Sequence, residues 1–172
     1  MIVAGKGDDD PFLDFGAGSD VQVGDIAAPV PEVYDIGGGI AAAALSRAGC
    51  AVLLQVLAEA KPVDNIVCLF TARRNLDSRG ARNAAPALQA DRIVSVELTA
   101  WKKGSDQPAL QSDFLLSGKD SEAAVLSLHG GGTTAAVLGI PARYLDTAMP
   151  VCRLEDIEAA GRMAIEIAEA AL

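Results

Sequence analysis

The sequence PVDNIVCLFTARRNLDSRGARNAAPALQADRIVSVELT, residues 62–99, decides the fold. Residues 65–71 form a nearly continuous apolar, β-branched run, which predicts a strand buried on both faces. A polar loop over residues 73–78, a small-residue helix over 80–88 and a second buried strand over 93–98 complete a β-loop-α-β unit. Ligands of such units gather just past the carboxyl ends of the strands. These ends carry Arg73, Arg74, Asn75 and Glu97, so we expect any chemistry there.

Length and composition predict one soluble domain with a core of small aliphatic side chains. The chain has 172 residues, of which 51% are hydrophobic and only 4% aromatic. Its net charge of −9 argues against a nucleic-acid partner and against an anionic membrane surface. No charged-then-apolar leader opens the sequence, and no apolar run reaches the roughly 18 residues that a membrane span needs.

The three cysteines are an odd number without close spacing, which does not indicate a disulfide framework or a zinc site. Cys50 and Cys68 fall in apolar runs, and we expect both to be reduced core residues. This cysteine usage is typical of a cytoplasmic protein.

The first part of the chain predicts a small antiparallel segment followed by a long helix. Between residues 12 and 36, three short runs alternate apolar and polar residues and are separated by glycine and proline. Residues 46–60 predict a helix with Ser46 as its N-cap, ended by Pro62. Because this helix is apolar around most of its circumference, we expect the sheet on one side and a second element or another subunit on the other.

The second part continues the alternation of strands and helices. Strands are predicted over residues 109–116 and 133–140, a helix capped by Asp120 or Ser121 runs to about Leu128, and a closing helix covers 153–172. The fold class is therefore α/β, with a mixed, largely parallel sheet flanked by helices. The single histidine, His129, precedes three glycines in what we interpret as a turn, and it excludes a His-rich zinc site.

Several segments then resemble one family, in collinear order. The segment AAALSRAGCAVLL is similar to GKALDNRAGCAVLL of the two-metal glutamyl or deblocking aminopeptidases that form tetrahedral shells, some of which are labelled cellulases or endoglucanases. The segment LFTARRNLDSRGARNAA is similar to FTVQEEVGLRGARTAA, and GIPARYLDTAMPVCRLEDIEAA to GIPTRYIHSPVEVVDLRDVEAA. The resemblance implies that residues 1–39 are a remnant of the family's inserted β domain and that residues 40–172 are the α/β core. It also implies that the family's first α/β segment is missing.

The departures from the family motifs fall on its metal ligands and its general base. Leu45 stands where the family has an aspartate that bridges the two metals, and Arg74 and Asn75 stand where it has a pair of glutamates. Glu97 and Asp146 occupy the positions of two further ligands. Two carboxylates make a weak, open site, and Arg74 would repel a divalent ion at close range. We therefore expect no catalytic residue and no cofactor; the alternative is one divalent metal (Zn, Co, Mn or Mg) on Glu97 and Asp146.

The arginine cluster leaves two interpretations open. Arg73 and Arg74, with Asn75, could bind a small anion or peptide at the strand ends. Alternatively, Arg74 faces Glu97 and Asp146, and an internal salt bridge replaces the metals. Our leading hypothesis is a catalytically degenerate homologue that self-associates as a homo-oligomer; the other two are an anion-binding module and a residual metal-dependent hydrolase.

Overall fold

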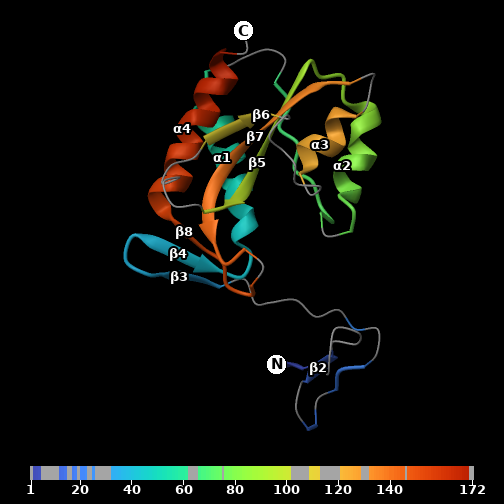
Figure 1. The fold of residues 1–172 in the computed structure, drawn as a ribbon, viewed down its shortest axis with the longest axis vertical. Coiled ribbons are helices and arrows are strands. Elements are labelled where there is room, and N and C mark those ends of the chain that lie inside the picture. The colour runs from blue at the N-terminus through green and yellow to red at the C-terminus, as the bar shows by residue number, and fades with distance from the viewer. Residues whose placement is uncertain are drawn as a thin grey trace.

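A computed structural model describes most of the chain (Figure 1). It covers residues 2–4, 12–14, 17–18, 20–22, 25, 32–61, 66–74, 76–101, 109–112, 121–128, 132–145 and 147–170. Asn75, His129 and Asp146 lie outside these described residues. No helix of the described part is long and apolar enough to cross a membrane.

The centre of the fold is a six-stranded mixed sheet. Its path runs through β3 (Val33–Asp35), β4 (Gly39–Ala42), β8 (Val151–Arg153), β7 (Thr134–Arg143) and β5 (Arg92–Ala100), and β6 (Ala109–Ser112) also pairs with β7. The strands β5 and β7 are parallel in register from Arg92 opposite Thr134 to Ala100 opposite Ala142. The other pairings among the described strands are antiparallel, so the sheet is mixed as expected but less parallel.

Helices cover both faces of the β5–β7 pair (Figure 1). On one face, α1 (Ala48–Glu59) and α4 (Leu154–Ala170) pack over Leu138 and Ile140 of β7. On the other face, α3 (Glu122–Ser127) packs over Ala135 and Val137, and α2 (Arg79–Ala84) packs against α3. Leu138 and Ile140 are completely buried, which places the main core between the sheet and the α1–α4 layer.

Small residues allow the close approach of α1 to the sheet, as the composition predicts. A Cβ atom added at Gly49 of α1 would lie 2.5 Å from the carbonyl oxygen of Val96 in β5. Ala48, Ala160 and Ala164 fill much of the interface between α1 and α4. Large side chains at these positions would force the helices away from the sheet.

Several predicted elements are confirmed. The predicted strands over 93–98 and 133–140 are β5 and β7, and the helix over 80–88 is α2 followed by a 3-10 turn, η2 (Ala85–Ala87). Ser121 caps α3 as predicted, accepting a hydrogen bond from the backbone N–H of Ala123 at 3.1 Å. At the N-terminal end, β1 (Ile2–Ala4) pairs with β2 (Phe12–Asp14) to form a separate antiparallel sheet.

The predicted strand over 65–71 is wrong for its described part, because residues 66–71 form no strand. Two of its side chains pack into different clusters: Cys68 contacts the core under α1 and Leu69 contacts the cluster of α2 and α3. Val67 is 74% exposed, so the segment is not buried on both faces either. An apolar β-branched run indicates extended backbone, but it does not show that a partner strand is present.

The structure corrects the start of the first long helix and adds one strand. The helix predicted from Ser46 starts with a 3-10 turn, η1 (Leu45–Arg47), and Ser46 is not its N-cap. The strand β8 was not predicted, and it immediately precedes α4. The second element predicted beside this helix is α4, which packs against α1 in the main core, while Leu54 and Leu57 are 58% and 61% exposed and are covered by no element of the described chain.

Candidate functional site

The candidate site lies on the α3 side of β5, around the carboxylate of Glu97. Alternation along β5 places Ser95 and Glu97 on the same face of the strand, toward α3. Glu97 is only 8% exposed, which is unusual for a carboxylate without compensating partners. The hydrogen bonds of this carboxylate therefore decide what the site can do.

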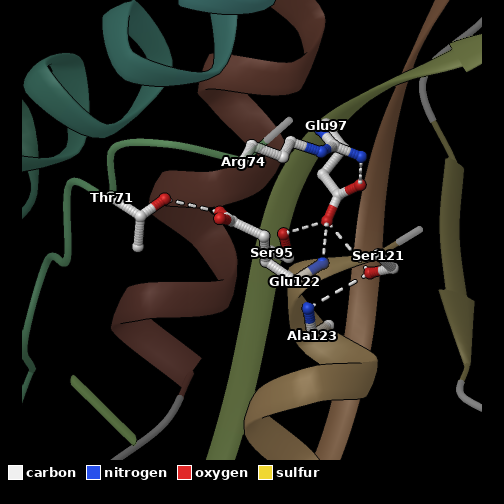
Figure 2. A network of polar contacts seen from close by, with 7 residues as sticks. All are labelled: Thr71, Arg74, Ser95, Glu97, Ser121, Glu122 and Ala123. Carbon is white, nitrogen blue, oxygen red and sulfur yellow. Dashed lines mark hydrogen bonds and ion pairs between the residues drawn. The ribbon is translucent and has the colours of Figure 1, made fainter. Parts of the chain in front are cut away.

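Both carboxylate oxygens of Glu97 are occupied by donors from the protein itself (Figure 2). Oε2 accepts a charge-assisted hydrogen bond from Nη2 of Arg74 at 2.6 Å. Oε1 accepts from Oγ of Ser95 at 2.5 Å, from Oγ of Ser121 at 2.9 Å and from the backbone N–H of Glu122 at 3.1 Å. Three donors saturate Oε1, and Oε2 is paired with a guanidinium cation beside which a metal ion would have to bind.

A second contact ties the segment before Arg74 to the start of α3. Oγ1 of Thr71 donates a hydrogen bond to Oε2 of Glu122 at 2.6 Å (Figure 2). The other oxygen of Glu122, Oε1, is buried and accepts no hydrogen bond from the residues that the structure describes. Thr71 and Arg74 thus both attach the segment over 66–74 to the region around Glu97.

The loop that carries Arg74 has an unusual backbone. Arg73, Asp77 and Ser78 all adopt positive φ angles, of 61°, 56° and 48°, although none of them is glycine. Such conformations cost on the order of 1 kcal/mol each and persist where surrounding contacts determine them. The backbone N–H of Ser78 donates to the carbonyl oxygen of Arg74 at 2.9 Å, which helps to fix the loop.

The structure brings two of the predicted site residues together and leaves a third exposed to solvent. Arg74 and Glu97 form an ion pair, whereas Arg73 is exposed and Asn75 and Asp146 lie outside the described residues. Because the charge of Arg74 is engaged by Glu97, this part of the chain does not support an anion pocket built on Arg74.

The described residues do not fit the metal ions that the family resemblance implies. Leu45, at the position of the bridging aspartate, is 3% exposed and packs in an apolar cluster with Ala42 and Cys152. Glu97 is satisfied by protein donors, and a guanidinium lies beside it. Among the described residues, no group of three or more His, Cys, Asp or Glu side chains could hold a metal ion.

Sequence reasoning missed three partners of Glu97: Ser95, Ser121 and the backbone amide of Glu122. The only signal for Ser95 is its position two residues before Glu97 in a strand, which places both side chains on one face. Ser121 is found as a helix cap, but nothing in the sequence indicates that the same hydroxyl also reaches Glu97.

The structure corrects the predicted burial of one cysteine and shows why the pKa values of the other two are raised. All three are free thiols, but Cys50 is exposed on α1 rather than in the core, while Cys68 is half-buried and Cys152 is buried. Burial raises the pKa of the Cys152 thiol to about 11, with a further contribution from the nearby charge of Asp156. Burial also raises the pKa of Cys68.

Comparison with known proteins places this architecture in a family. The chain is 24% identical to a protein from Acetivibrio thermocellus named "Putative aminopeptidase", over 90% of this chain and 61% of that protein. Among solved structures, it matches aminopeptidase APDkam598 from the archaeon Desulfurococcus kamchatkensis with a TM-score of 0.79 and 23% identity, covering 93% of this chain and 59% of that one.

A further solved structure, PhTET1-12s, is named as a dodecamer; it matches with a TM-score of 0.63 and 15% identity, over 80% of this chain and 53% of that one. The chain spans about three fifths of the length of the Acetivibrio thermocellus protein. The sequence model of the M42 glutamyl aminopeptidases matches residues 12–119, which is more than half of the chain. The chain therefore belongs to the M42 glutamyl aminopeptidase family.

Proposed function

We propose that this chain is a non-catalytic member of the M42 family, in which an internal ion pair has replaced the catalytic centre. The single observation that carries the proposal is the contact between Arg74 and Glu97 at 2.6 Å. By the resemblance, Arg74 stands at the family's base position and Glu97 at a ligand position. A permanent guanidinium cation at close range to a carboxylate both neutralises that ligand and repels a divalent ion.

The hydrogen bonds of Glu97 support the same conclusion. To ligate a metal through Oε1, Glu97 would have to give up three donors, and this would leave polar groups unpaired in a mostly buried environment. To ligate through Oε2, it would have to bind the ion beside the guanidinium of Arg74 or give up that partner. A bridging ligand would also be needed, and Leu45 has no donor atom for one. Metal-dependent hydrolysis on Glu97 and Asp146, and anion binding by Arg73, Arg74 and Asn75, stay as the alternative predictions.

The test of this proposal is metal content combined with activity. We expect that protein dialysed against zinc, cobalt, manganese and magnesium retains no stoichiometric metal by plasma mass spectrometry. We also expect no turnover of alanyl, leucyl or glutamyl anilides with any of these ions. Metal-dependent cleavage that disappears in Glu97→Gln, but persists in the surface control Glu155→Gln, would overturn the proposal.

We further propose that the protein self-associates through the outer face of α1. Cys50, Leu54 and Leu57 are spaced four and three residues apart, so they lie on one side of the helix, and all three are exposed. An exposed apolar stripe of this kind favours an interface over contact with water. The dodecameric relative PhTET1-12s makes assembly a reasonable expectation for the family.

A further inference from the structure

A hollow lies where the parallel strands β5 and β7 end. It has a volume of about 520 Å³ and is lined mainly by Trp101, directly after β5, and by Arg143, Tyr144, Leu145 and Thr147 at the end of β7. The carboxyl ends of parallel strands are where open α/β sheets bind ligands. The volume lies within the range of roughly 300–1,000 Å³ that is typical of small-molecule sites.

One wall of the hollow is a cation stacked on an aromatic ring. The guanidinium carbon of Arg143 lies 4.1 Å from the centre of the Trp101 ring. The backbone N–H of Trp101 donates to the carbonyl oxygen of Ala142 at 2.8 Å, which holds the two residues side by side on neighbouring strands. Stacking uses the flat face of the guanidinium and leaves the N–H groups at its edge able to donate.

The charge of Arg143 is not neutralised by the described part of the chain. No carboxylate there lies within ion-pair distance of it, in contrast to Arg74, Arg82 and Arg153, which each pair with an acid. What distinguishes Arg143 from the other arginines that lack such a partner in the described part of the chain is its place in the hollow, over the ring of Trp101. Arg143 offers a bidentate contact to an incoming anion.

The rim of the hollow is held in place rather than loose. Tyr144 adopts a left-handed backbone conformation, with φ at 57°, and the residue is 64% exposed. Its carbonyl oxygen accepts hydrogen bonds from the N–H of Thr147 at 3.1 Å and from Oγ1 of Thr147 at 2.7 Å. Strained backbone that is fixed in this way is characteristic of ligand sites.

We propose that this hollow binds a small organic anion, a carboxylate joined to an apolar group. Arg143 donates to the carboxylate, and the Trp101 ring, Tyr144 and Leu145 contact the apolar group. An inorganic anion would leave the aromatic and aliphatic wall without a partner. An uncharged apolar molecule would leave Arg143 without one. The inference goes beyond the proposed loss of catalysis and does not depend on it, because binding needs neither metal nor turnover.

The test uses the fluorescence of Trp101, which is the only tryptophan in the sequence. The probes are N-acetylphenylalanine, its uncharged amide, and inorganic phosphate, each titrated into the whole chain, with isothermal titration calorimetry as a second readout. We expect a saturable change in fluorescence and a matching heat for the acid. We expect at least about tenfold weaker binding for the amide, since a hydrogen bond to a charged group is lost, and no saturable response to phosphate.

The variants assign the binding to Arg143. In Arg143→Gln, the Kd for N-acetylphenylalanine should rise at least about tenfold by calorimetry. The Kd of Arg143→Lys should lie between that of Arg143→Gln and that of the unchanged chain. Arg153→Gln is the matched control, because Arg153 is an exposed arginine that pairs with Glu155 and does not line the hollow. The proposal is overturned if the acid gives no saturable binding, if acid and amide bind equally, or if Arg143→Gln binds like Arg153→Gln.

Discussion

Nη2 of Arg74 lies 2.6 Å from Oε2 of Glu97, and the two side chains differ sharply in exposure, at 41% and 7%. The carboxylate is therefore buried while its cationic partner is partly in water. Loss of Arg74 leaves a buried negative charge with only neutral donors, whereas loss of Glu97 leaves an arginine that water can still solvate.

This asymmetry gives the first prediction. We expect Arg74→Met to lower the free energy of unfolding by about 1–2 kcal/mol, which is less than for a fully buried pair because water partly screens the guanidinium. In a double-mutant cycle with Glu97→Gln, the coupling should be about 1 kcal/mol or more by urea unfolding. The control pair is Arg82 with Asp77, which is 3.0 Å apart and much more exposed, and should couple by less than about 0.5 kcal/mol. Equal coupling free energies in the two pairs would show that the burial of Glu97 does not strengthen its interaction with Arg74.

The second prediction concerns the pH dependence of stability through Cys152. Its pKa is raised from 9.0 to about 11 in the folded state, so the folded protein holds the thiol proton more tightly than the unfolded chain. The resulting stabilisation is fully present below pH 9 and is lost as the pH rises toward about 11.

Urea unfolding in a reducing buffer, repeated across this pH range, checks that expectation. The Cys152→Ala variant should lose less stability than the unchanged chain as the pH rises. Part of the slope of unfolding free energy against pH should remain in this variant, because burial raises the pKa of Cys68 as well. Cys50→Ser is the control, since Cys50 is exposed, and should show the full slope. If Cys152→Ala follows the unchanged chain at every pH, Cys152 is not the source of the slope.

The sequence predicts the central fold well, because the long apolar runs of β5 and β7 have few alternatives. For Arg74 the sequence leaves two interpretations open, an anion site and an internal ion pair, and the structure shows the ion pair with Glu97. The neutral donors to Glu97 are not predictable, because a hydroxyl from Ser121 reaches it only through the packing of α3 on β5. The missing strand over 66–71 and the exposure of Cys50 share one cause: an apolar residue type does not reveal whether a partner element is present to cover it.

The third prediction compares two glycines in helices. At Gly49, a new Cβ would lie 2.5 Å from a backbone carbonyl oxygen of β5, which cannot move without disturbing the sheet. We expect Gly49→Ala to destabilise the protein by about 1–3 kcal/mol despite the better helix propensity of alanine. At Gly161 in α4, the new Cβ would meet the end of the flexible Gln55 side chain at 2.0 Å, and that side chain can turn away.

Gly161→Ala should therefore be neutral, or stabilising by up to about 1 kcal/mol through helix propensity. Thermal and urea unfolding of both variants, side by side, measure the difference. Equal destabilisation by the two substitutions would mean that the close approach of α1 to β5 is not a constraint on the fold.

The last prediction tests self-association through α1. Sedimentation velocity at high micromolar concentration should show species larger than the monomer for the unchanged chain. Leu54→Glu combined with Leu57→Glu should shift the protein to monomer, because two carboxylates would have to lose water at the interface. Leu128→Glu is the control: Leu128 is 80% exposed but lies just after α3, on the other side of the sheet. Its sedimentation profile should match that of the unchanged chain. A purely monomeric profile for the unchanged chain would remove self-association from the proposed function while leaving the Arg74–Glu97 argument intact, since that ion pair lies within one chain.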